Sequence, residues 1–205
     1  IIGSAELLEN GLVKPEDQPR FLSRIHQEAD RLVSLINDIL RLSQLDEGGA
    51  LPHEQVSVLE LAQEAARSLT AQAAAQAVHI SVTGTAGTVF GVRRLLYEIA
   101  RNLCENAVKY NVPGGSVTVE VAETDRDVTL LVRDTGIGIP EGDQSRVFER
   151  FYRVDKSHSR AIGGTGLGLS IVKHAVAYHH GTLRLESQPG KGTVITVTLP
   201  KEPTE

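Results

Sequence analysis

The sequence feature that most limits the fold is a change of hydrophobic period near residue 47. Before that point, apolar positions are separated by alternating steps of three and four residues, at Leu22, Ile25, Ala29, Leu32, Ile36 and Ile39. Such heptad spacing is typical of a helix that carries one continuous apolar seam. After a linker at 48–53, short helical stretches interleave with alternating, strand-like runs. The chain is therefore predicted to have a helical part followed by a separate α/β part.

Residues 1–47 predict a helical hairpin. Residues 1–9 resemble the end of a first helix, closed by Asn10-Gly11, and the second helix begins near Asp17-Gln-Pro19. A hairpin alone leaves its seam in water, so we expect two copies to pair as a dimeric four-helix bundle. The alternative is a hairpin that packs on the next domain of its own chain.

Residues 54–201 predict one domain, which makes the whole chain α+β. Expected helices cover 57–76, 92–110 and 168–178, and expected strands cover 79–83, 116–122, 127–133, 182–186 and 193–199. The first of these helices opens on a capping-box signature, Ser57-x-x-Glu60. The order of elements favours a two-layer α/β sandwich, with one helical layer on a mixed or antiparallel sheet.

The composition excludes several functional classes. A net charge of −5 argues against a nucleic-acid-binding surface. The single cysteine, Cys104, rules out an internal disulfide and fits a reducing compartment. No apolar run approaches the roughly 20 residues of a membrane helix. The 205 residues contain no methionine, which predicts that they are a piece of a longer protein.

The motif Asp134-Thr-Gly136-Ile-Gly138-Ile139-Pro140 follows an expected strand. A buried carboxylate there could accept a hydrogen bond from the exocyclic amine of adenine, and guanine would leave it unpaired. The glycines would let a flat ring lie against the backbone. Taken alone, the motif is equally compatible with an Asx turn.

A second motif, Gly163-Gly164-Thr165-Gly166-Leu167-Gly168, leads into an expected helix. Exposed N–H groups and the positive end of the helix dipole would suit phosphate there. The motif is neither a Walker loop, since no Gly-Lys-Ser/Thr follows, nor a dinucleotide fingerprint, since no strand precedes it. A flexible hinge is the alternative.

A third motif places two amides on one helix face. Asn102 and Asn106 are four residues apart, and Lys109 follows three residues later. Because Mg²⁺ takes oxygen ligands and keeps waters, one asparagine carbonyl together with phosphate oxygens would suffice to hold it. An exposed polar helix face is the alternative.

The fourth motif, residues 148–155, concentrates two phenylalanines and a tyrosine in five residues. This composition indicates an anchored aromatic patch, from which Arg153 could reach a terminal phosphate. A small hydrophobic staple for a loop is the alternative.

Taken together, and in their order along the chain, the four motifs resemble those of the bacterial sensor histidine kinases of two-component systems, especially the phosphate-sensing and cell-wall-sensing type. The resemblance covers nearly the whole chain. Residues 102–110 look like the N box, 134–140 the G1 box, 148–155 the F box and 164–169 the G2 box. Residues 28–46 look like the second helix of the dimerisation and phosphotransfer domain.

The resemblance implies a role for each matching residue. Asp134 would bind the adenine amine with Thr193 behind it through water, and Asn106 would hold Mg²⁺. The floor of the adenine pocket would be formed by Gly136, Gly138 and Ile139. The residues expected to line the phosphates or sugar are Asn102, Lys109, Tyr110, Gly164, Thr165, Gly166, Leu167 and Gly168. Residues 140–165 would form a mobile ATP lid that carries Arg153 to the γ-phosphate, with Asn102 and Arg153 as the catalytic residues of this chain.

The resemblance also implies a reaction and partners. ATP would phosphorylate a histidine of the bundle, and the phosphoryl group would pass to an aspartate of a response-regulator receiver domain. The expected setting is a homodimer in the cytoplasmic portion of a membrane-anchored protein, without direct membrane contact by this piece. Two other functions stay open: an ATP-gated interaction module without phosphotransfer, and an ATPase of the gyrase or Hsp90 type.

The chain departs from the family pattern at its histidines. None of the seven stands in the His-Glu/Asp context that the family uses on its first bundle helix; His53-Glu54 has the dipeptide but lies in the linker. The acceptor is therefore expected upstream, and these 205 residues alone are predicted not to autophosphorylate. His180 stands where the family usually has glycine, which raises a question about the local turn.

Overall fold

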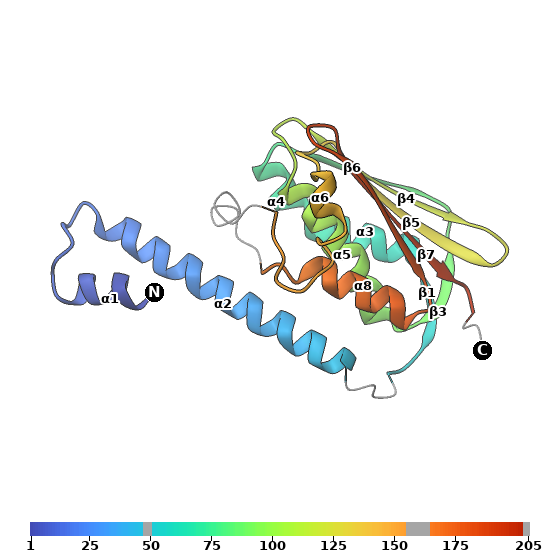
Figure 1. The fold of residues 1–205 in the computed structure, drawn as a ribbon, viewed down its shortest axis with the longest axis horizontal. Coiled ribbons are helices and arrows are strands. Elements are labelled where there is room, and N and C mark those ends of the chain that lie inside the picture. The colour runs from blue at the N-terminus through green and yellow to red at the C-terminus, as the bar shows by residue number, and fades with distance from the viewer. Residues whose placement is uncertain (47–50, 155–164, 203–205) are drawn as a thin grey trace.

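The computed structural model describes residues 1–46, 51–154 and 165–202. Figure 1 shows a long helical hairpin that projects from an α/β part, with one stretch of the second helix alongside the α/β part. The hairpin consists of α1 (Ile2–Glu9) and α2 (Gln18–Asp46). In the described ranges, no helix has the length and apolar character needed to cross a membrane.

Helix α2 confirms that the residues with heptad spacing form one helix. It begins after Asp17, whose carbonyl accepts hydrogen bonds from the N–H groups of Arg20 and Phe21 at 3.0 and 3.2 Å. Seam side chains lie in solvent in the single chain: Leu22 is 58% exposed and Ile36 is 57% exposed. Helix α2 also contacts α8 (Gly168–Tyr178), so it both docks on its own α/β part and leaves much of its seam open.

The five-stranded sheet is mixed, in the order β2-β4-β5-β7-β6. Its strands are β2 (His79–Gly84), β4 (Ser116–Glu123), β5 (Asp127–Asp134), β7 (Gly192–Pro200) and β6 (Thr182–Gln188). Only the β2–β4 pair is parallel; the other three pairs are antiparallel. The prediction of a mixed or antiparallel sheet with strands in these five segments is confirmed, and the β2–β4 pair makes the sheet mixed.

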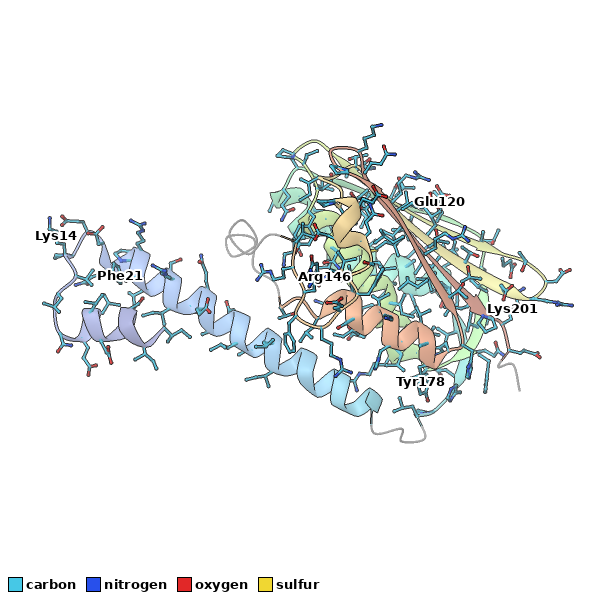
Figure 2. All side chains as sticks on the ribbon, in the orientation of Figure 1. Lys14, Phe21, Glu120, Arg146, Tyr178 and Lys201 are labelled. Atoms are coloured by element: carbon cyan, nitrogen blue, oxygen red, sulfur yellow. The ribbon has the colours of Figure 1, made fainter. Side chains whose placement is uncertain are left out.

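One helical layer covers one face of this sheet (Figure 1). It contains α3 (Val58–Ser68), α4 (Thr70–Ala75), α5 (Arg93–Lys109) and α8. Alternation along the strands directs buried valines toward these helices, while Glu120 of β4 lies on the open face (Figure 2). Cys104 of α5 belongs to this core, and burial raises the pKa of its thiol to about 12. The two-layer sandwich is therefore confirmed.

Three local features differ from the prediction. A two-stranded antiparallel sheet joins β1 (Glu54–Ser57) to β3 (Thr88–Gly91), and a short helix α6 covers Glu141–Gln144. Each was missed because four residues show almost no periodicity. The helix expected over 57–76 is broken at Leu69, where the hydroxyls of Ser68 and Thr70 donate to nearby backbone carbonyls. Its start is as predicted, since Ser57 Oγ accepts from the Glu60 N–H at 3.3 Å.

A buried histidine ties the end of α8 to the start of α5. His179 Nδ1 lies 2.7 Å from the Ala175 carbonyl, and its Nε2 accepts from the Val92 N–H at 3.0 Å. A carbonyl can only accept and an amide N–H can only donate, so the imidazole is neutral with its proton on Nδ1. His53 of the linker stacks on Tyr178 with ring centroids 5.8 Å apart.

We expect the stability of the protein to depend on pH because His179 is neutral in the folded state. Burial lowers the pKa of His179, and the nearby His53 and His180 lower it further against the opposing Ala175 hydrogen bond. The unfolded chain, with a His pKa of about 6.5, therefore binds a proton more readily than the folded chain. Stability should fall as pH drops below about 6.5, by at most about 1.4 kcal/mol per pH unit from this group.

Urea unfolding at pH 7.5, 6.5 and 5.5 measures this slope. His179→Leu should flatten it, whereas His79→Asn, at an exposed position in β2, should keep it. An equal slope in wild type and His179→Leu would assign the acid sensitivity to other groups.

His180 forms the turn that the family pattern put in question. Its φ of +55° is left-handed, as at a helix C-terminal glycine. The N–H groups of His180 and Gly181 bond to the carbonyls of Ala177 and Val176, which closes a Schellman motif. The turn therefore forms with a histidine in the strained position.

Candidate functional site

The site is built around Asp134 at the end of β5. Val128, Leu130 and Val132 point into the core, and the same alternation places Asp134 on the inner face of the sheet. Its Oδ1 accepts from the N–H of Gly136 at 2.8 Å and from that of Thr193 at 3.2 Å. Burial raises the pKa of Asp134, and these two hydrogen bonds oppose the shift.

Gly136 and Gly138 allow close backbone packing at the start of the loop after β5. A Cβ on Gly136 would lie 2.3 Å from the Tyr110 carbonyl oxygen, and one on Gly138 would lie 2.0 Å from the Gln188 carbonyl oxygen. Gly138 also has a φ of +69°. The side that a side chain would occupy is therefore filled by the protein's own backbone, which the sequence motif does not reveal.

Sequence reasoning missed two residues that support this loop. Ser187 Oγ accepts from the Ile139 N–H at 2.8 Å and lies 3.0 Å from Thr193 Oγ1. Gln144 Nε2 donates to the carbonyls of Ile139 and Ser187 at 3.0 and 2.9 Å. Neither residue lies in a glycine or acidic motif. The pairing of β6 with β7 brings Ser187 to the site, and the contact of α6 with β6 brings Gln144 there.

The amide face of α5 meets the start of α8. Asn102 is buried, and its Nδ2 donates to the Glu98 carbonyl at 2.8 Å and to Glu98 Oε2 at 3.2 Å. A Cβ on Gly168 would lie 2.9 Å from Asn102 Oδ1 and 3.7 Å from Asn106 Nδ2. Asn102, Asn106 and the N-terminus of α8 are therefore neighbours in space, as the motif predictions require.

The glycine-rich segment contributes backbone more than side chains. Leu167 is fully buried and packs with Ile171 and Leu35. The Leu167 N–H donates to Thr165 Oγ1 at 3.3 Å. Gly166 has a φ of +74°, and a Cβ there would lie 2.9 Å from the Phe151 carbonyl carbon. The prediction for Gly164, like that for Asp155, falls outside the described residues.

Three predicted phosphate-side residues share one environment. Burial lowers the pKa of Lys109, with Glu105 opposing and Arg153 lowering it further. Burial raises the pKa of Tyr110, while Arg153 opposes that shift. Lys109 Nζ lies 5.7 Å from the centroid of the Tyr110 ring. The fold thus brings Arg153, which is 44 residues from Lys109, close enough to add to the same positive region.

The aromatic segment near Arg153 is only partly anchored. Tyr152 donates its hydroxyl hydrogen to Asp143, and its ring lies 4.2 Å from the guanidinium of Arg146 (labelled in Figure 2). Phe151, in contrast, is 58% exposed and has a φ of +65°. The aromatic patch was predicted as a unit, but its two neighbouring rings, those of Phe151 and Tyr152, have different environments.

Comparison with known proteins identifies the family of this chain. Residues 91–203 match the family of histidine kinase-, DNA gyrase B- and HSP90-like ATPases, and residues 1–48 match the His Kinase A (phospho-acceptor) domain. The sensor-like histidine kinase SenX3 of Mycolicibacterium smegmatis is 40% identical over 98% of this chain and 54% of its own length.

Two solved structures share the fold. The mycobacterial sensor histidine kinase MprB is 33% identical, with a TM-score of 0.64 over 75% of this chain and 100% of that chain. Full-length ShkA in complex with AMPPNP is 28% identical, with a TM-score of 0.75 over 97% of this chain and 42% of that chain.

The chain therefore belongs to the histidine kinase-, DNA gyrase B- and HSP90-like ATPases. Within that family its relatives are sensor histidine kinases, because the phospho-acceptor domain match precedes the ATPase match. The chain spans about half the length of SenX3.

Proposed function

We propose that this chain is the ATP-binding catalytic part of a sensor histidine kinase. The observation that carries the proposal is the paired placement of Asp134 and Thr193 on the inner face of adjacent strands, at the edge of the helical layer. An ionised carboxylate there accepts from the 6-amino group of adenine. Gly136, Gly138 and Ile139 form the backbone beside it. The ShkA relative, whose structure contains AMPPNP, supports a nucleotide at this site.

The phosphates are proposed to lie between α5 and the N-terminus of α8. Lys109 and Arg153 supply positive charge, and Tyr110 and Asn102 line the sugar or phosphates. The backbone of Thr165, Gly166 and Gly168 would supply N–H donors, and the resemblance extends this role to Gly164 and Leu167. The half-buried amide of Asn106 faces the α8 N-terminus, so its carbonyl could hold Mg²⁺ together with phosphate oxygens. The ion would neutralise charge on the transferring phosphoryl group.

The proposed reaction moves the γ-phosphoryl group of ATP to a histidine of a phospho-acceptor helix. No histidine of these 205 residues stands in the family's acceptor context, so the chain by itself is proposed not to label itself. The acceptor would then pass the group to an aspartate of a response regulator. The exposed seam of α2 supports homodimerisation through residues 1–47, ahead of a linker at 48–53 and a catalytic domain at 54–201. The sensor-kinase relatives support a cytoplasmic setting.

Incubation with ATP labelled on its γ-phosphate tests this function. The chain is mixed with Mg²⁺ and ATP, with and without a separately prepared phospho-acceptor domain of a sensor histidine kinase. We expect acid-labile label on the added domain and none on this chain. Label on this chain would contradict the assignment of its histidines. Nucleotide binding without any transfer would favour the ATP-gated module, and rapid phosphate release without an acceptor would favour a gyrase-type or Hsp90-type ATPase.

A further inference from the structure

Ser187 occupies the position in β6 that pairs with Thr193 in β7. Thr193 in turn is joined to Asp134 of β5 through its backbone N–H. The three side chains belong to three adjacent strands and lie on the inner face of the sheet. A group bound by Asp134 is therefore also close to Thr193, whereas Ser187 lies one strand further away.

The hydrogen bonds of Ser187 determine the direction of its contact with Thr193. Ser187 Oγ lies 2.9 Å from the Gly192 carbonyl oxygen, and a carbonyl only accepts, so the one hydroxyl hydrogen of Ser187 is donated there. Ser187 accepts from the Ile139 N–H at 2.8 Å. The remaining contact, 3.0 Å from Thr193 Oγ1, must then receive its hydrogen from Thr193.

This assignment leaves Thr193 with lone pairs and no free hydrogen. Asp134, when ionised, likewise only accepts. The base side of the site consequently presents two acceptors. A purine with an amino group at position 6 offers them hydrogens, whereas a purine with a carbonyl at position 6 directs its own lone pairs at them.

We propose that Ser187 is a positioning residue that sets base specificity, because it holds the Thr193 hydroxyl as an acceptor. The inference deepens the proposed function and rests on it, since it assumes that Asp134 binds the base. Without Ser187, the Thr193 hydroxyl could rotate and donate towards a 6-carbonyl, directly or through the water that the family resemblance places between them. Ser187 is not proposed to touch the base; it also holds the Ile139 N–H, but the effect on base specificity is proposed to pass through Thr193.

The test compares the affinities for ATP and for inosine triphosphate, which carries a carbonyl at position 6, by isothermal titration calorimetry. We expect wild type to bind ATP more tightly than inosine triphosphate. In Ser187→Ala, the ratio of the ATP affinity to the inosine triphosphate affinity should fall about tenfold. Ser187→Thr keeps a hydroxyl and should restore the preference. If Ser187 had a purely structural role, Ser187→Ala would weaken the binding of both nucleotides equally and leave the affinity ratio unchanged. That result would overturn the inference.

A double-mutant cycle separates an effect through Thr193 from any other. In a Thr193→Val background no hydroxyl can rotate, so adding Ser187→Ala should leave the ratio as it is. An undiminished tenfold change in that background would also overturn the inference. If Ser187→Ala does not fold, Ser187→Cys repeats the test with a weak acceptor of similar shape and should lower the ratio in the same direction. Failure of wild type to bind ATP would instead overturn the proposed function itself.

Discussion

Replacing Asp134 with asparagine is expected to weaken ATP binding by about 10- to 100-fold. Asparagine has nearly the same shape, but it loses the negative charge. Hydrogen bonds to charged groups contribute about 1.5–3 kcal/mol, which corresponds to this range of affinity. The amide also brings a donor that cannot pair with an amino group on the base.

The same carboxyl makes binding sensitive to acid. Because burial holds the pKa of Asp134 above its usual range, the group begins to take up a proton at a higher pH than an exposed aspartate. The protonated form accepts less well, so ATP affinity should fall on acidification, and Asp134→Asn should remove that part of the pH dependence.

Calorimetric titration with ATP over a series of pH values measures both effects. Asp125→Asn is the matched control, since Asp125 is exposed in the turn between β4 and β5 and should bind ATP as wild type does. Circular dichroism confirms that each variant is folded. Equal affinity in Asp134→Asn and wild type would remove Asp134 from the base site.

The second large effect is expected from Gly138→Ala. The methyl group would lie 2.0 Å from the Gln188 carbonyl oxygen, and alanine would have to adopt a φ of +69°. The left-handed conformation alone costs roughly 1–2 kcal/mol, and the contact forces the loop to move away from β6. We expect stability to fall by about 2 kcal/mol or more, and ATP affinity to fall at least tenfold because Ile139 shifts with the loop.

Substitutions at two other glycines separate the cost of the positive φ from the cost of the close contact. Gly190 has a φ of +75° but open space around its Cβ position, so Gly190→Ala should show the conformational cost alone, about 1 kcal/mol. Gly142, in α6, has open space and no positive φ, so Gly142→Ala should be neutral or slightly stabilising. Urea unfolding ranks the three variants. A Gly138→Ala protein no less stable than Gly190→Ala would show that the close contact is relieved easily.

Much of the fold follows from the sequence because long elements repeat their pattern several times. Helix α5 was predicted over 92–110 and is found over Arg93–Lys109, since its seventeen residues alternate apolar and polar faces through many turns. Strands β4 and β5 were predicted as a pair because residues 116–122 and 127–133 alternate, and each strand extends one residue further in the structure. Strands β1 and β3 were not predicted because each contains a single buried valine, Val56 in β1 and Val89 in β3.

By itself, the sequence determined which residue types could do chemistry here and the local element on which each one lies. Asp134 at a strand end and two asparagines one helical turn apart are local facts, governed by alternation and helical period. Only the tertiary structure decided that Ser187 pairs with Thr193 and that Arg153 shares an environment with Lys109. Those neighbours are set by strand register and by helix packing, which depend on the whole core rather than on any short stretch of chain.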